Sequence, residues 1–96
     1  MPVVHLGVLA ELDLADIWSY SAARWGEEQA EEYLDSIGLA VEQLATYPEA
    51  GTRRDSVREG YRVLFVGSHA VYYRLTVSTV WIVRVLHERM DPFKHL

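Results

Sequence analysis

Residues 61–86 read YRVLFVGSHAVYYRLTVSTVWIVRVL and are the most strand-like part of the chain. β-Branched and aromatic residues fill three runs, at 61–66, 70–75 and 80–86, and only three or four residues separate each run from the next. This composition is typical of β-strands, and connections this short force neighbouring strands to run antiparallel. The stretch therefore predicts a three-stranded antiparallel meander.

Two helices are predicted upstream of the meander. Apolar residues recur every three or four positions within 10–25 and again within 30–45. Gly26 separates the two stripes and Pro48 ends the second, because glycine suits the left-handed turn after a helix and proline cannot continue one. With so short a connection the helices must double back as an antiparallel hairpin. Trp25 lies on the first stripe and is expected to pack in the core.

A short β-branched run at residues 3–8 predicts a first strand, whereas residues 49–60 contain glycines and many charges and predict a loop. The element order is then β-α-α-β-β-β. We predict one α+β domain over residues 1–96, in which the helical hairpin packs on one face of a mainly antiparallel sheet. Residues 90–96 are expected to be extended or to form one turn. There is no cysteine, so packing must stabilise the fold without disulfides.

Charge is distributed unevenly, although the formal net charge of the chain is −5. Residues 1–50 hold one arginine against ten acidic side chains, whereas residues 51–96 hold eight arginines or lysines against four acidic side chains. The second half is therefore expected to present a surface that favours an anionic partner. The N-terminus lacks a basic region, and no apolar run is long enough to cross a bilayer, so we expect a cytoplasmic protein.

No motif indicates a cofactor, a metal ion or a catalytic site. The glycines are scattered singly, and the four histidines never occur at ligand spacing on one predicted element. We therefore expect no cofactor, no metal ion and no catalytic residue. The glutamates of the second predicted helix are explained by a solvated face whose charge complements the helix dipole.

Arginines on the predicted strands are the clearest sign of a binding surface. Arg62, Arg74 and Arg84 occupy three successive strands, and His87 and Arg89 follow the last one. Because the helices cover one sheet face, we expect the arginines to share the open face, where their guanidinium groups suit phosphate or carboxylate groups. The alternative is that they solvate the sheet or pair with acidic residues of the helical hairpin.

Several motifs in a fixed order resemble one known family. They are Ala10-x-x-Asp13-Leu14-x-x-Ile17-x-x-Tyr20, Trp25-Gly26-x-x-Gln29-Ala30-x-x-Tyr33, Leu44-Ala45-x-x-Pro48-x-x-Gly51, Arg58-x-Gly60-Tyr61-Arg62, His69-x-x-x-Tyr73 and Arg84-Val85-Leu86-His87-x-x-Met90-Asp91. Each motif alone is weak, but together they cover nearly the whole chain. In this order and spacing the chain resembles the ParE branch of the RelE/ParE toxin superfamily.

This resemblance implies the toxin of a type II toxin–antitoxin pair, which inhibits DNA gyrase by protein–protein binding and is neutralised by a ParD-like antitoxin. Target binding is then expected at Arg58, Tyr61, Arg62, Arg84, His87 and Arg89. Antitoxin binding is expected on the helical hairpin, at Leu14, Trp18, Tyr33 and Ile37. Neither a membrane nor a specific nucleic-acid sequence is expected as a partner.

The same superfamily implies one alternative, a RelE-type endoribonuclease that acts on ribosome-bound mRNA. Such a ribonuclease needs basic or acid–base groups around the scissile phosphate. Glu88 and Pro92 stand about where RelE-like ribonucleases carry a basic residue and a terminal tyrosine. This difference favours inhibition without catalysis.

Overall fold

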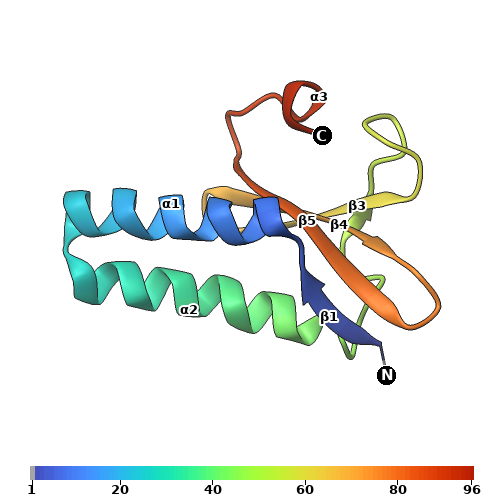
Figure 1. Cartoon of the computed structure of the whole chain (residues 1–96), viewed down its shortest axis with the longest axis horizontal. Helices are drawn as coiled ribbons and strands as arrows, with labels where there is room; N and C mark the ends of the chain where they lie inside the picture. The colour runs from blue at the N-terminus through green and yellow to red at the C-terminus, as the bar shows by residue number, and fades with distance from the viewer. Residues whose placement is uncertain (1) are drawn as a thin grey trace.

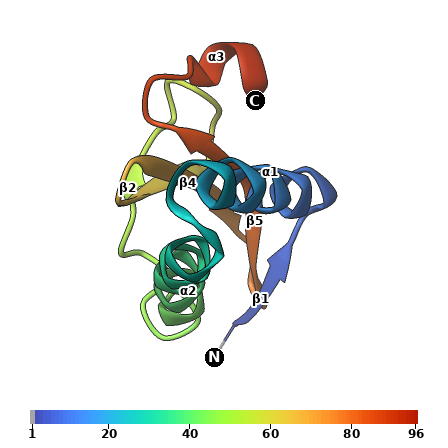
Figure 2. The same ribbon diagram turned by 90° about the vertical axis from the view of Figure 1, so that its left-hand side faces the viewer.

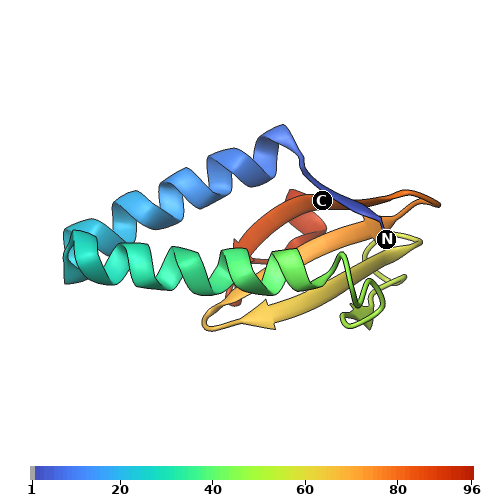
Figure 3. The ribbon, with the colours of Figure 1, turned by 90° about the horizontal axis from the view of Figure 1, so that it is seen from below.

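The computed structural model describes residues 2–96, which form a helical hairpin, a five-stranded sheet and a short C-terminal helix (Figure 1). In chain order the elements are β1 (Val3–Leu6), α1 (Val8–Trp25), α2 (Glu27–Gln43), β2 (Thr52–Arg53), β3 (Tyr61–Val66), β4 (His69–Leu75), β5 (Thr79–His87) and α3 (Pro92–His95). The hairpin extends beyond the sheet at the end where α1 turns into α2 (Figure 3). No helix in the described residues has the length and apolar character needed to cross a membrane.

The sheet has the strand order β1-β5-β4-β3-β2. β3, β4 and β5 form the antiparallel meander, β2 pairs antiparallel with β3, and β1 pairs in parallel with β5. β1 follows β5 only as far as the pair Leu6 and Ile82, because α1 begins at Val8. In the described part of the chain, the outer edge of β5 beyond Ile82 therefore has no strand beside it.

Both long helices lie on the same side of the sheet (Figure 2). They join at Gly26, whose φ of 95° is a conformation that glycine adopts without a steric penalty. The Gly26 N–H donates to the carbonyl of Ala22 and so satisfies one of the last carbonyl groups of α1. Ala10 of α1 and Ala30 of α2 are fully buried, and their small side chains allow close packing of the hairpin.

The sheet separates two apolar clusters. The larger cluster fills the space between sheet and helices and consists of Ala10, Ile37, Val41, Leu44, Val71, Tyr73, Val80, Ile82 and Val85. The smaller cluster lies on the far face and consists of Val63, Ala70, Tyr72 and Leu86, with Leu96 packed against it. Burial of each large aliphatic side chain contributes roughly 1.5–3 kcal/mol. Packing under the hairpin is thus the main source of stability.

The predicted fold class is confirmed: the hairpin covers one face of a sheet in which three of the four strand pairings are antiparallel. Near the C-terminus Pro92–His95 form one turn, α3, and the Asp91 side chain caps it by accepting the N–H of Phe93. Residues 49–60 are not wholly irregular, because Thr52 and Arg53 form β2. Two residues are too few to show an alternating pattern, so the sequence does not predict this strand.

Candidate functional site

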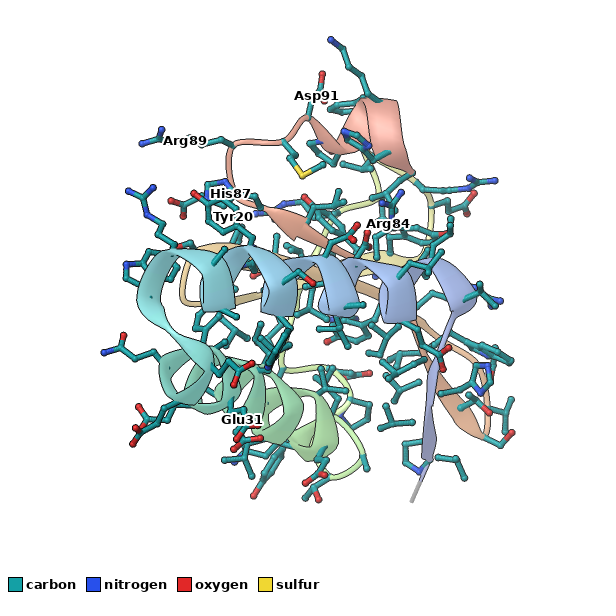
Figure 4. All side chains as sticks on the ribbon, turned by 60° about the vertical axis from the view of Figure 1, so that its left-hand side comes forward. Tyr20, Glu31, Arg84, His87, Arg89 and Asp91 are labelled. Carbon is teal, nitrogen blue, oxygen red and sulfur yellow. The ribbon has the colours of Figure 1, made fainter. Side chains whose placement is uncertain are left out.

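A groove of about 800 Å³ lies between α1 and the C-terminal end of β5. It exists because β1 ends at Leu6, opposite Ile82, which leaves α1 to border the rest of β5 directly. Tyr20 from α1 and His87 from β5 both line it, as does Arg89 (Figure 4). The groove therefore brings residues from both halves of the chain to one surface.

Two exposed aromatic side chains form the α1 side of this groove. Tyr20 is 62% exposed and Trp25 is 55% exposed, and their rings meet edge to face at a centroid distance of 6.1 Å. The guanidinium of Arg24 lies 5.5 Å from the centre of the Trp25 ring. The expected core packing of Trp25 is wrong, because the hairpin projects beyond the sheet at this end (Figure 3). Exposed aromatic pairs of this kind are typical anchors for a protein partner.

A cluster of Tyr33, His69 and His87 lies inside the groove. The Tyr33 hydroxyl is hydrogen-bonded to Nδ1 of His69 and accepts the N–H of Ser68 at 3.2 Å. The rings of His69 and His87, which are paired in the β4–β5 register, meet edge-on with centroids 5.3 Å apart. Nδ1 of His87 in turn accepts the N–H of Arg89 at 3.2 Å.

The turn between β3 and β4 allows this cluster to form. Gly67 has a φ of 56°, and a Cβ at this position would lie 2.7 Å from the ring of Tyr33. Glycine therefore permits both the left-handed turn and the close approach of Tyr33. Burial lowers the pKa of His69 below 6.5 and the neighbouring His87 lowers it further, while Glu88 raises it. Burial also raises the pKa of Tyr33, so burial favours the neutral form of both groups.

The groove combines aromatic surfaces with charges of both signs. Asp16 and Glu88 line it together with Arg24 and Arg89. Among residues 2–96, no group of three or more histidine, aspartate or glutamate side chains is arranged to hold a metal ion. A lining of this kind suits a polypeptide segment with apolar and charged side chains, and the two histidines also provide groups that can exchange a proton.

The expectation that the strand arginines share one open face is wrong. Arg62 lies in phase with Leu64, which packs beneath the helices, whereas Arg84 is paired with Tyr72 of the far-face cluster. A bulge in the β4–β5 pairing skips Val83. A single extra residue moves the following side chains to the other face of a sheet. Arg62 and Arg84 consequently point to opposite sides.

Arg62 and Arg74 both have partners within the protein. Arg62 donates through Nη1 to the carbonyl of Gly51 at 2.8 Å and so ties β3 to the loop before β2. The guanidinium of Arg74 lies 5.3 Å from the centre of the Trp81 ring, on the neighbouring strand. Arg74 thus covers an aromatic side chain on the far face.

Arg84 makes a two-pronged ion pair with Asp13 of α1. Its Nε and Nη2 atoms donate to the two carboxylate oxygens, each at 2.8 Å, and both side chains are about 15% exposed (16% and 14%). The Asp13 carboxylate raises the pKa of Arg84. The alternative prediction, that a strand arginine pairs with an acidic residue of the hairpin, is confirmed for Arg84.

The remaining residues expected to bind the target fall into two groups. Tyr61 is buried on the far face, so its side chain offers no contact surface and this expectation is wrong. His87 is half-buried in the groove, whereas Arg58 and Arg89 are exposed. The loop that carries Arg58 lies at the same end of the molecule as α3 (Figures 1 and 2).

The four residues expected to bind an antitoxin differ in how far they are buried. Ile37 is 1% exposed within the main core, so its expected contact is wrong. Leu14 packs against that core and Trp18 is half-buried. Tyr33 lines the groove. The sequence does not show which face of the hairpin is exposed, and the antitoxin contact itself stays a prediction.

Sequence reasoning missed three groove residues, namely Tyr20, Trp25 and His69. For Trp25 the sequence does contain a signal, namely its position next to Gly26 at the end of the hairpin, where a helix can extend beyond the sheet. His69 offered no comparable signal, because its position opposite His87 depends on the bulge in β5.

A helical hairpin packed on a sheet in this way is also found in chains of two toxin–antitoxin systems. The structure is similar to a chain of the chromosomal ParDE system from P. aeruginosa, with a TM-score of 0.81 and 22% identity over 91% of this chain and 96% of that chain. It is also similar to a chain of the RelBE2 toxin–antitoxin complex from Mycobacterium tuberculosis, with a TM-score of 0.65 and 21% identity over 91% of this chain and 99% of that chain. At such identities the similarity shows the fold alone.

The sequence defines the family. Residues 4–92 match the family described as "ParE toxin of type II toxin-antitoxin system, parDE". Toxin ParE1 of Caulobacter vibrioides is 45% identical over 96 residues, which cover all of this chain and 99% of that protein. Toxin ParE1 of Mycobacterium tuberculosis is 42% identical over 92 residues, which cover 95% of this chain and 94% of that protein. The chain therefore belongs to the ParE toxin family.

Proposed function

We propose that this ParE-family toxin inhibits DNA gyrase by protein–protein binding and that a ParD-like antitoxin neutralises it. Membership of the family supports the proposal, as does the similarity of the fold to a chain of a ParDE system. The observation that carries it is a set of exposed apolar side chains at the groove and on the C-terminal segment, namely Tyr20, Trp25, Met90 and Phe93. Contiguous exposed apolar surface marks sites for macromolecular partners.

The groove is the proposed antitoxin site. Tyr20 and Trp25 offer large, rigid contact areas, and Ile17 and Met90 add apolar surface nearby. A segment that orders on binding can bury such anchors and match the surrounding charges. Tyr33 would contact the same segment, which retains one of the residues expected from the sequence.

The C-terminal segment, residues 88–96, is the proposed target-binding surface. Phe93 is 65% exposed, and the exposed cationic side chains of Arg89 and Lys94 flank it. Aromatic and arginine side chains contribute most to affinity in protein interfaces. Arg58, on the neighbouring loop, would extend this surface.

A supercoiling assay tests the target. Gyrase is incubated with relaxed plasmid, ATP and increasing toxin, and wild type is expected to block supercoiling. Phe93→Ser should raise the toxin concentration needed for half-inhibition by about tenfold or more. Glu31→Gln is the matched control, because Glu31 is exposed on α2, away from this segment (Figure 4). Full supercoiling at every wild-type concentration would exclude gyrase as the target.

Ribonuclease activity is the second candidate, and the Tyr33, His69 and His87 cluster favours it. A histidine whose neutral form is favoured by burial, such as His69, can act as a base in phosphodiester cleavage, and the cation of Arg89 lines the same groove. Translating ribosomes with a defined message test this candidate. Cleavage by wild type that is lost in His87→Ala would establish it, whereas intact message would support inhibition without catalysis.

A further inference from the structure

Asp13 connects α1 to the unpaired edge of β5. Its Oδ2 atom accepts the backbone N–H of Val85 at 2.9 Å, at a point that β1 does not reach. The carboxylate therefore takes the place of a neighbouring strand for this N–H group. The same carboxylate holds Nε and Nη2 of Arg84.

Arg84 extends this connection to the end of the chain. Its third nitrogen, Nη1, donates to the carbonyl of His95 at 3.1 Å. In residues 2–96 this is the one hydrogen bond that joins residues 91–96 to the rest of the protein, because the others that involve this segment stay within it. Leu96 also packs against the far-face cluster. One guanidinium thus joins α1, β5 and the C-terminal turn.

We infer that Asp13 and Arg84 are positioning residues that hold the C-terminal turn in its target-binding geometry. The inference rests on the proposed role of residues 88–96 in gyrase inhibition. A tail of one turn has too few internal contacts to stay ordered alone. If it were free, binding would have to order it, which weakens affinity. The Asp13–Arg84 pair removes that requirement before the target arrives.

The geometry of the guanidinium is essential to this role. Arginine presents a planar fork that reaches two carboxylate oxygens and a carbonyl at the same time, whereas lysine carries a single ammonium on a flexible stem. Arg84→Lys therefore keeps the charge beside Asp13 but cannot make all three contacts. Arg74→Lys is the matched control, because Arg74 lies on the adjacent strand and contacts Trp81 instead of the tail.

The first measurement is order in the tail. Backbone ¹⁵N relaxation of wild type should give order parameters typical of folded backbone for Phe93, Lys94 and Leu96. In Arg84→Lys these values should fall below about 0.6, the range of flexible segments. Arg74→Lys should match wild type. An ordered tail in Arg84→Lys would overturn the inference directly.

The second measurement is function. Arg84→Lys should need about tenfold more toxin for half-inhibition of gyrase, whereas its affinity for a ParD-like antitoxin, which binds at the groove, should change less than about twofold. A mobile tail with unchanged inhibition would overturn the positioning role, and so would an equal loss of both activities. Deletion of residues 91–96 separates this result from the proposal on which it rests. If the deletion leaves inhibition intact, the tail is not the target surface at all.

A second variant distinguishes the two contacts of the carboxylate. Asp13→Asn keeps an oxygen for the Val85 N–H and removes one of the two acceptors for Arg84. The tail should therefore be less mobile than in Arg84→Lys but more mobile than in wild type. Wild-type order parameters in Asp13→Asn would show that Asp13 does not act through Arg84.

Discussion

Loss of the Tyr73 hydroxyl should destabilise the fold far more than the removal of one oxygen atom suggests. The ring of Tyr73 is fully buried beneath the helices. Its hydroxyl donates to the carbonyl of Pro48 at 2.9 Å and accepts the N–H of Gly51 at 2.8 Å. Tyr73→Phe keeps the ring and its packing but removes both hydrogen bonds.

The magnitude follows from the burial of each partner. Gly51 is buried, and within residues 2–96 its N–H has no other acceptor. Leaving a buried N–H without a partner costs about 1–3 kcal/mol. Pro48 is only half-buried, so water can reach its carbonyl and the added cost should be below about 1 kcal/mol. We expect the free energy of unfolding to fall by about 2–3 kcal/mol, which lowers Tm by roughly 10–20 °C for a chain of this size.

Urea unfolding followed by circular dichroism measures this change, provided that the slope with denaturant is the same in both proteins. Tyr47→Phe is the control, because Tyr47 is exposed and its hydroxyl forms no hydrogen bond within the described residues. The control should stay within about 0.5 kcal/mol of wild type. A loss of less than about 0.5 kcal/mol in Tyr73→Phe as well would contradict this expectation, because it would mean that the N–H of Gly51 readily finds another partner.

Four further substitutions test other parts of the structure. Leu44→Ala, which empties a site 1% exposed in the core, should cost about 2–5 kcal/mol in urea unfolding, and a cost below about 1 kcal/mol would show that the site collapses. Gly67→Ala places a Cβ 2.7 Å from the Tyr33 ring at a positive φ and should lower the free energy of unfolding by about 1–3 kcal/mol. Gly38→Ala, in open space on α2, should raise it by about 0.5–1 kcal/mol. A Gly67→Ala protein more stable than Gly38→Ala in urea unfolding would contradict both predictions. The pKa of His69 is lower in the folded state than its unfolded value of about 6.5. The free energy of unfolding should therefore decrease as pH falls from about 6.5 toward the lower folded-state pKa. His69→Gln should remove this contribution, and an unchanged dependence in urea titrations between about pH 7.5 and about pH 5 would argue against it.

The sequence predicts most of the fold because its strongest signals are local. Short connections between β-branched runs specify the meander, and two apolar stripes separated by Gly26 specify the hairpin. These features depend on neighbouring residues, so they can be read without knowledge of long-range pairing. β2 escapes prediction because its pairing with β3 is long-range and only two residues long.

The candidate site is harder to predict because it depends on register. Counting outward from the turn at residues 76–78 pairs His69 with Leu86, and the bulge at Val83 is what brings His87 opposite instead. The same bulge moves Arg84 to the far face. The residue types in this stretch do not predict a bulge, because a β-bulge can form without a glycine. The sequence therefore predicts neither the histidine cluster nor the arrangement of the arginines, and only the structure shows them.

The positions of the cations explain why the proposed target surface lies off the strands. A guanidinium held close to a sheet loses much of its water and needs acceptors within the protein. The half-buried Arg62 and Arg84 have such acceptors in a carbonyl and a carboxylate, whereas the exposed Arg74 lies over an aromatic ring. Arg58 on the loop between β2 and β3, and Arg89 and Lys94 on the C-terminal segment, remain exposed, so they can exchange water for a partner's acidic groups at little cost. The basic second half of the chain thus serves two purposes, since its strand arginines stabilise the toxin and its loop and tail cations remain available to bind.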